Sequence, residues 1–190
     1  MSGPYTIPNL LTAIRIALIP AIVVLFYLPY HWSDMACGIM FGFVGITDAF
    51  DGYLARKLGQ VSRLGAFLDP VADKLIVATA LVLIVSKNPV WYVTLTAAVI
   101  IGREIAISAL REWMSEIGAR HKMKVSGVGK FKTIVQIVGL SMMLFREDLF
   151  GLPMYKVGLG LTVLAAVLTL WSMAAYLNAA GPDLRSSGQT

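Results

Sequence analysis

Four aspartates, Asp48, Asp51, Asp69 and Asp73, lie close together in a chain that is otherwise rich in apolar residues. The first two are three positions apart and the last two are four positions apart, so each pair shares one face of a helix. A carboxylate within an apolar segment is costly unless a cation compensates its charge. A divalent metal ion is the simplest such cation, and ligation by oxygen alone favours Mg²⁺ or Mn²⁺.

The acidic cluster also indicates a reaction. Four carboxylates are enough to hold two metal ions, and two ions can bridge phosphate groups. Such a pair neutralises a diphosphate, stabilises the leaving oxygen and orients an attacking hydroxyl, while a less tightly bound carboxylate takes the proton of the hydroxyl. We therefore expect two divalent cations as cofactors.

The composition is that of an integral membrane protein, because 57% of the residues are hydrophobic and only 14% are charged. Six apolar segments are long enough to cross a hydrocarbon core of about 30 Å, which takes about 20 helical residues. They cover residues 8–29, 35–54, 65–85, 90–110, 125–144 and 152–177. We expect an all-α protein with six transmembrane helices in one domain over residues 1–180, followed by a short cytoplasmic tail over residues 181–190.

Basic residues predict the orientation of these helices. Lysine and arginine gather around the connections between the second and third segments and between the fourth and fifth, whereas only Lys87, Arg146 and Lys156 fall on the other side. Loops on the cytoplasmic side carry such an excess. Both termini are therefore expected in the cytoplasm, with the aspartates near the cytoplasmic interface. No basic face is left exposed for nucleic acid.

Other residues complete a longer pattern around the aspartates. Glycine on a helix surface lets a nucleotide or phosphate approach the backbone, and arginine forms paired hydrogen bonds with phosphate oxygens. The pattern runs D-x-x-D-G-x-x-A-R, eight residues, then G-x-x-x-D-x-x-x-D, and it is filled by Asp48, Asp51, Gly52, Ala55, Arg56, Gly65, Asp69 and Asp73.

This pattern resembles the signature of the CDP-alcohol phosphotransferase family. The resemblance implies six transmembrane helices, commonly a homodimer, and a two-metal site at which an alcohol attacks a CDP-linked substrate and CMP is released. It further implies that the four aspartates are metal ligands and that Asp73 is also the general base. The residues expected to contact the nucleotide and diphosphate are Gly52, Ala55, Arg56 and Gly65.

Charged residues in the other apolar segments bear on the acceptor alcohol. Several cations would not be needed for an acceptor without phosphate, such as choline or free inositol, whereas a phosphorylated alcohol would be held by them through charge-assisted hydrogen bonds. Glu104, Ser108 and Arg111 fall on one helical stripe, which predicts that they face the interior. The candidates are Arg15, Arg103, Glu104, Arg111, Lys130 and Lys132.

Further stretches resemble the bacterial branch of this family that joins CDP-diacylglycerol to glycerol 3-phosphate, giving phosphatidylglycerol phosphate and CMP. They are residues 8–12 with Arg15, 102–104, 110–112 and 129–133 with Gln136. This resemblance implies phospholipid biosynthesis in the bacterial inner membrane, among membrane lipids, with the active site facing the cytoplasm. The residues it assigns to glycerol phosphate are Asn9, Thr12, Arg15, Arg103, Arg111, Lys130 and Lys132.

Two alternatives remain open. One is an enzyme of the same family with another phosphorylated acceptor, such as inositol phosphate. The other is a divalent-cation transporter, which would also place carboxylates in membrane helices. Transporters commonly have repeated halves and a site near the bilayer midplane, but the sequence has no obvious repeat and its aspartates lie toward one face.

Overall fold

A computed structural model describes residues 7–58, 63–118 and 127–187 of the chain, and within these helices it leaves out the side chains of residues 7–11, 48–58, 63–64, 66–67, 127–130 and 175–187. These residues form six helices and no strand, which confirms the all-α prediction. The helices are α1 (Ile7–Tyr27), α2 (Ser33–Leu58), α3 (Arg63–Lys87), α4 (Trp91–Glu116), α5 (Gly127–Phe145) and α6 (Met154–Ser187).

Each predicted apolar segment corresponds to one helix, but three helices run further than the apolar pattern. α2 continues to Leu58, α4 to Glu116 and α6 to Ser187. The extra turns are rich in polar and charged residues, and helical hydrogen bonds do not depend on side-chain polarity. The pattern of apolar residues therefore predicts the helices but not their polar ends, and α6 extends into residues 181–187 of the predicted tail.

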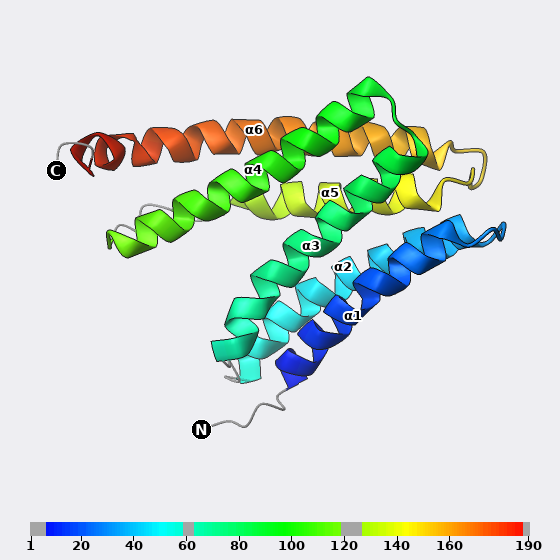
Figure 1. Cartoon of the computed structure of the whole chain (residues 1–190), viewed down its shortest axis with the longest axis horizontal. Helices are drawn as coiled ribbons and strands as arrows, with labels where there is room; N and C mark the ends of the chain where they lie inside the picture. Colours follow the sequence, from blue (N-terminus) through cyan, green and yellow to red (C-terminus); the bar gives the residue numbers. More distant parts are fainter. Residues whose placement is uncertain (1–6, 59–62, 119–126, 188–190) are drawn as a thin grey trace.

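The helices alternate in direction (Figure 1). α5 and α6 lie side by side as an antiparallel pair, α4 crosses this pair, and α1, α2 and α3 form a second group. α5 also packs against α2, and α1 packs against both α2 and α3. Buried apolar side chains from every helix meet in one core; examples in chain order are Ile22, Phe41, Ile84, Ile100, Leu140 and Ala166.

Two glycines allow α5 and α6 to approach each other closely. A Cβ atom added to Gly158 would lie 2.6 Å from the carbonyl oxygen of Gly139 and 2.9 Å from the backbone nitrogen of Met143. Side chains larger than hydrogen would force these two helices apart. Small residues at helix contacts are a common means of packing membrane helices.

The outer surface is apolar on all six helices. Large hydrophobic side chains are between 59% and 78% exposed on each of them; in chain order, examples are Val24, Phe43, Val82, Ile105, Ile134 and Trp171. Within the described residues, Trp91–Glu116 and Met154–Ala174 are each apolar over a length sufficient to cross a bilayer, and α1, α2 and α5 carry shorter apolar stretches. So extensive an apolar surface is that of a membrane protein.

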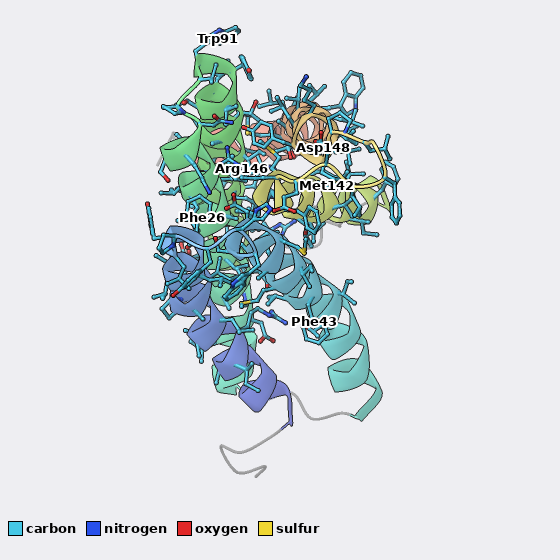
Figure 2. The ribbon with its side chains drawn as sticks, turned by 90° about the vertical axis from the view of Figure 1, so that its right-hand side faces the viewer. Phe26, Phe43, Trp91, Met142, Arg146 and Asp148 are labelled. Atoms are coloured by element: carbon cyan, nitrogen blue, oxygen red, sulfur yellow. The ribbon has the colours of Figure 1, made fainter. Side chains whose placement is uncertain are left out.

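A charged cluster joins α2, α3 and the connection that follows α5, at the end of the molecule seen in Figure 2. The Lys87 ammonium lies 2.6 Å from a carboxylate oxygen of Asp34, and the Arg146 Nε lies 4.0 Å from the other oxygen. Lys87 also lies over the ring of Phe26, and Arg146 over that of Tyr155. Asp34 thus compensates two of the three basic residues that the sequence assigned to the outer side.

Candidate active site

Helix α1 contacts two of the four aspartates, Asp69 and Asp73, which both lie on α3. The Thr12 hydroxyl donates a hydrogen bond to the Asp69 carboxylate. The Arg15 guanidinium donates to an oxygen of Asp73 across 2.6 Å, and its side chain is only 5% exposed. Because both acidic groups are held by donors of one helix, the packing of α1 on α3 determines how they point.

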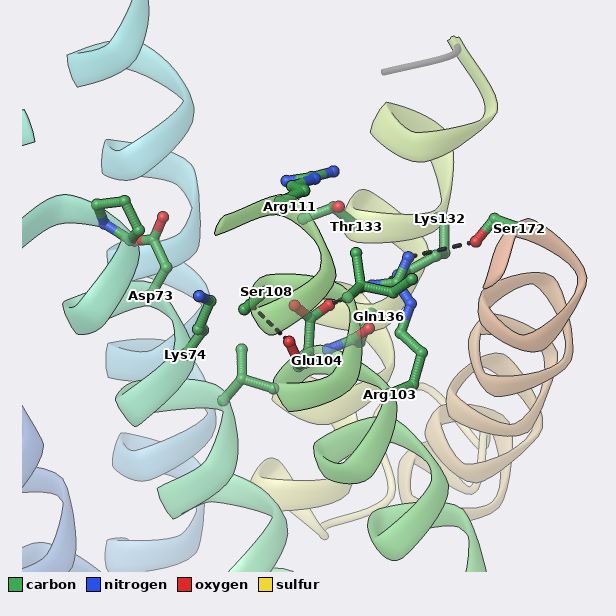
Figure 3. Close-up of a pocket in the computed structure, with 13 residues that line it drawn as sticks. Asp73, Lys74, Arg103, Glu104, Ser108, Arg111, Lys132, Thr133, Gln136 and Ser172 are labelled. Carbon is green, nitrogen blue, oxygen red and sulfur yellow. Dashed lines mark hydrogen bonds and ion pairs between the residues drawn. The ribbon is translucent and has the colours of Figure 1, made fainter. Parts of the chain in front are cut away.

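Asp73 also lines a cavity of about 340 Å³ between α3, α4, α5 and α6. Figure 3 shows its polar side chains converging from these helices. Those labelled there are Asp73, Lys74, Arg103, Glu104, Ser108, Arg111, Lys132, Thr133, Gln136 and Ser172. The cavity has four basic and two acidic side chains, so its positive charge suits an anionic ligand.

Arg103 is fixed at both ends of its guanidinium group. Its Nη1 donates to Glu104 across 2.6 Å, and its Nη2 donates to the Ser172 hydroxyl of α6 across 3.2 Å. Its Nε is buried and has no hydrogen-bond partner among the described residues. A buried donor of this kind is costly unless a ligand or water accepts from it.

Lys132 of α5 lies beside this pair. Its Nζ is 3.7 Å from the same Glu104 oxygen, and its side chain is 5% exposed. The neighbouring Gln136, one turn further along α5, is also buried. A buried ammonium, a clamped guanidinium and neutral hydrogen-bonding groups on one wall form an arrangement suited to a phosphate group with hydroxyls attached.

Comparison with known proteins identifies the family. A family model described as CDP-alcohol phosphatidyltransferase matches residues 5–173 of the chain. The chain belongs to this family.

Several similar proteins carry one name, CDP-diacylglycerol–glycerol-3-phosphate 3-phosphatidyltransferase. The protein from Salmonella choleraesuis (strain SC-B67) is 52% identical over 180 residues, which cover 95% of this chain and 97% of that protein. The one from Pectobacterium atrosepticum is 51% identical with the same coverage, and one from Shigella flexneri is 52% identical. The family membership expected from the aspartate pattern is therefore confirmed.

Within this CDP-alcohol phosphatidyltransferase, the structure brings several predicted site residues together. Asp73, Arg103, Arg111 and Lys132 line one cavity, although they come from three helices. The inward-facing stripe of Glu104, Ser108 and Arg111 is present as well. The predicted residues whose side chains lie outside the described part are Asn9, Asp48, Asp51, Gly52, Ala55, Arg56 and Lys130.

Thr12 and Arg15 occupy a place that the sequence did not indicate. They were expected at glycerol phosphate, and the structure places them on Asp69 and Asp73. Arg15 and Asp73 are 58 positions apart, so no local spacing connects them. Only the packing of α1 on α3 brings them into contact.

Other cavity residues were not predicted as site residues. Lys74 lies about 100° around the helix from Asp73, so no helical spacing groups the two, yet both residues line the cavity, which is wide enough to reach two sides of α3. Ser172 reaches it from α6, and its only signal in the sequence is a hydroxyl group within a long apolar helix. Thr133 was quoted only as part of a resembling stretch.

The carboxylate oxygens of Asp69 and Asp73 are ligands that suit a hard divalent cation. Asp69 and Asp73 lie one turn apart on α3, and each is oriented by a donor of α1. The described side chains contain no group of three or more potential metal ligands, but Asp48 and Asp51, which would complete the set, are not among them. The helix ends that carry the two pairs lie at the same end of the molecule (Figure 1).

Proposed function

We propose that this chain transfers the phosphatidyl group of CDP-diacylglycerol to glycerol 3-phosphate, giving phosphatidylglycerol phosphate and CMP. Relatives about half identical to it over nearly its whole length are named for this reaction. One observation supports the proposal most strongly. The expected general base, Asp73, lines the same cavity as the basic residues expected to hold the acceptor phosphate.

The acceptor phosphate would occupy the basic side of the cavity. Arg103, Lys132 and Arg111 supply donors from α4 and α5, and the unpartnered Nε of Arg103 offers one more. With its phosphate held there, glycerol 3-phosphate would direct its terminal hydroxyl toward Asp73, which lines the same cavity. This geometry turns a bimolecular encounter into an oriented approach.

The reaction is a single displacement. The terminal hydroxyl oxygen forms a bond to the phosphorus that bears diacylglycerol, its proton passes to the Asp73 carboxylate, and the bond from phosphorus to the CMP oxygen breaks. Arg15 supplies a counter-charge to Asp73 from the opposite side and restrains its orientation.

Two divalent cations, Mg²⁺ or Mn²⁺, would be held by Asp48, Asp51, Asp69 and Asp73. When bound, they would neutralise the diphosphate and stabilise the departing CMP. Thr12 and Arg15 would orient two of these four carboxylates. Gly52, Ala55, Arg56 and Gly65 would contact the nucleotide and diphosphate, as the family pattern implies.

The proposed placement in the membrane has all six helices spanning the bilayer as one domain, with both termini and the active site on the cytoplasmic side. CDP-diacylglycerol would enter sideways from the inner leaflet of the bacterial inner membrane, with its acyl chains remaining in lipid. Glycerol 3-phosphate would enter from water. As in the family at large, we expect the functional form to be a homodimer.

An acceptor panel tests the proposal. Purified protein would be incubated with CDP-diacylglycerol, Mg²⁺ or Mn²⁺ and one of four acceptors: glycerol 3-phosphate, inositol phosphate, glycerol or inositol. We expect CMP and phosphatidylglycerol phosphate with glycerol 3-phosphate and little CMP with the others. A preference for inositol phosphate would show that the enzyme uses that acceptor instead of glycerol 3-phosphate. Absence of CMP with every acceptor would contradict the proposed activity and favour the divalent-cation transporter.

A further inference from the structure

An acidic side chain lies in the middle of the basic wall of the cavity. One oxygen of Glu104 is 2.6 Å from Arg103 Nη1 and 3.7 Å from Lys132 Nζ, so it contacts or approaches two of the cations that a phosphate would need. Its charge opposes the binding of an anion. A site selected only for tight phosphate binding would not place a carboxylate there.

We propose that Glu104 is an internal competitor for the acceptor phosphate. Its carboxylate accepts a hydrogen bond from Arg103 and lies near the Lys132 ammonium, and it moves away from both cations when phosphate binds. Glu104 is thus a positioning residue that limits phosphate affinity. This inference rests on the proposed function, in which both the acceptor and the lipid product carry a phosphate monoester.

The exposures of the three side chains indicate which of them moves. The side chains of Lys132 and Arg103 are 5% and 9% exposed, whereas that of Glu104 is 32% exposed. Arg103 is also tied to Ser172 of the neighbouring helix. A partly hydrated carboxylate with rotatable bonds can turn toward solvent at lower cost than a buried guanidinium held at both ends can move.

The donors of Arg103 support the same exchange. Its Nη1 and Nη2 donate to Glu104 and Ser172, but its buried Nε has no partner among the described residues. A phosphate that replaces Glu104 at Nη1 takes over the hydrogen bond that the carboxylate gives up, so the exchange leaves this donor satisfied. The unpartnered Nε, on another edge of the same guanidinium, can donate to a further ligand oxygen or to water.

Competition between Glu104 and phosphate would assist release of the lipid product. The product, phosphatidylglycerol phosphate, is anchored by its acyl chains in the bilayer and by its phosphate in the cavity. When Glu104 returns to Arg103, it takes over the cation that the phosphate leaves, so the cavity does not have to open with an uncompensated buried charge.

A purely structural ion pair would behave differently when its charge is removed. If Glu104 only held Arg103 in place, Glu104→Gln would weaken phosphate binding, because the guanidinium would lose its orientation. If Glu104 competes with phosphate, the same substitution strengthens binding, because a repelling charge is removed while a hydrogen-bond acceptor remains at the same position.

The test measures equilibrium binding of inorganic phosphate and of glycerol 3-phosphate to the full-length protein without CDP-diacylglycerol, so that no turnover occurs. We expect Glu104→Gln to lower both dissociation constants by at least about threefold and to lower the KM for glycerol 3-phosphate, with kcat at or below that of the wild type. Glu116→Gln, on the same helix and exposed outside the cavity, is the matched control and should change neither constant.

Equal or weaker phosphate binding by Glu104→Gln would overturn the inference. Failure of the wild-type protein to bind either ligand would instead contradict the proposed acceptor site. If Glu104→Gln does not fold, Glu104→Asp serves in its place, because it keeps the charge but withdraws the carboxylate from Arg103. Phosphate should then bind more tightly than to the wild type, and weaker binding would again overturn the inference.

Discussion

Asp73 and Lys132 are close enough to line one cavity but belong to different helices and have different proposed tasks. The carboxylate would take a proton, and the ammonium would hold a phosphate. Substituting each residue separately therefore distinguishes chemistry from acceptor binding. The contact of α1 with the aspartates adds a third task, which is orientation of the groups proposed to hold metal.

Replacing Asp73 by Asn removes the proposed base with little change of shape. We expect CMP release to fall by about 10²- to 10⁴-fold, the usual contribution of a general base, and further if metal binding is also impaired. Activity would be measured as CMP formed by protein that retains the helical circular-dichroism spectrum of the wild type. Turnover close to the wild-type rate would remove Asp73 from this role.

Lys132→Ala removes a charge-assisted hydrogen bond to the acceptor phosphate. Bonds of this kind contribute about 1.5–3 kcal/mol, so the KM for glycerol 3-phosphate should rise by about 10- to 100-fold and that for CDP-diacylglycerol much less. Lys156→Ala, an exposed lysine on α6 outside the cavity, is the control. Equal weakening of both substrates by Lys132→Ala would contradict the assignment.

Thr12→Val separates two tasks proposed for α1. The structure places the Thr12 hydroxyl on Asp69, and groups that orient metal ligands commonly change metal affinity or activity by about 10- to 100-fold when removed. We expect the Mn²⁺ concentration for half-maximal activity, and the dissociation constant for Mn²⁺, to rise by that order. A change confined to the KM for glycerol 3-phosphate would instead support the role expected from the sequence.

At the scale of helices, the contact of α5 with α6 depends on the absence of a side chain at Gly158. A Cβ atom there would lie within 3.0 Å of atoms of α5, whereas one at Gly160, on the same helix, would meet nothing within 4 Å. Gly158→Ala should lower the free energy of unfolding by about 1–3 kcal/mol and lower the Tm in detergent, while Gly160→Ala leaves the Tm unchanged or slightly raised. Equal Tm values for the two variants would show that the helices adjust freely.

The helices themselves were largely predictable, because a membrane-spanning helix needs a long apolar segment and the sequence has six of them. Their packing was not. Thr12 meets Asp69 and Ser172 meets Arg103 across gaps of 57 and 69 positions, and no helical periodicity relates residues so far apart. The aspartates were recognisable because their spacing is local and because carboxylates in apolar segments require compensation.

At the scale of the whole molecule, the proposed orientation predicts which ends can be labelled from outside. The native Cys37 is fully buried, so it should contribute little background. A cysteine placed at His31, whose side chain is 95% exposed, should react with a membrane-impermeant maleimide in intact cells from which the outer-membrane barrier has been removed. A cysteine at Glu116 should react only after the inner membrane is opened, and the reverse pattern would invert the topology.

The most direct test of the central claim locates the metal. A crystal of the protein grown with Mn²⁺ would be measured at the manganese absorption edge, where anomalous scattering identifies the ion. We expect two manganese peaks bounded by Asp48, Asp51, Asp69 and Asp73, beside the cavity that contains Arg103 and Lys132. Aspartates pointing into separate pockets or into lipid, with manganese bound elsewhere, would contradict the account.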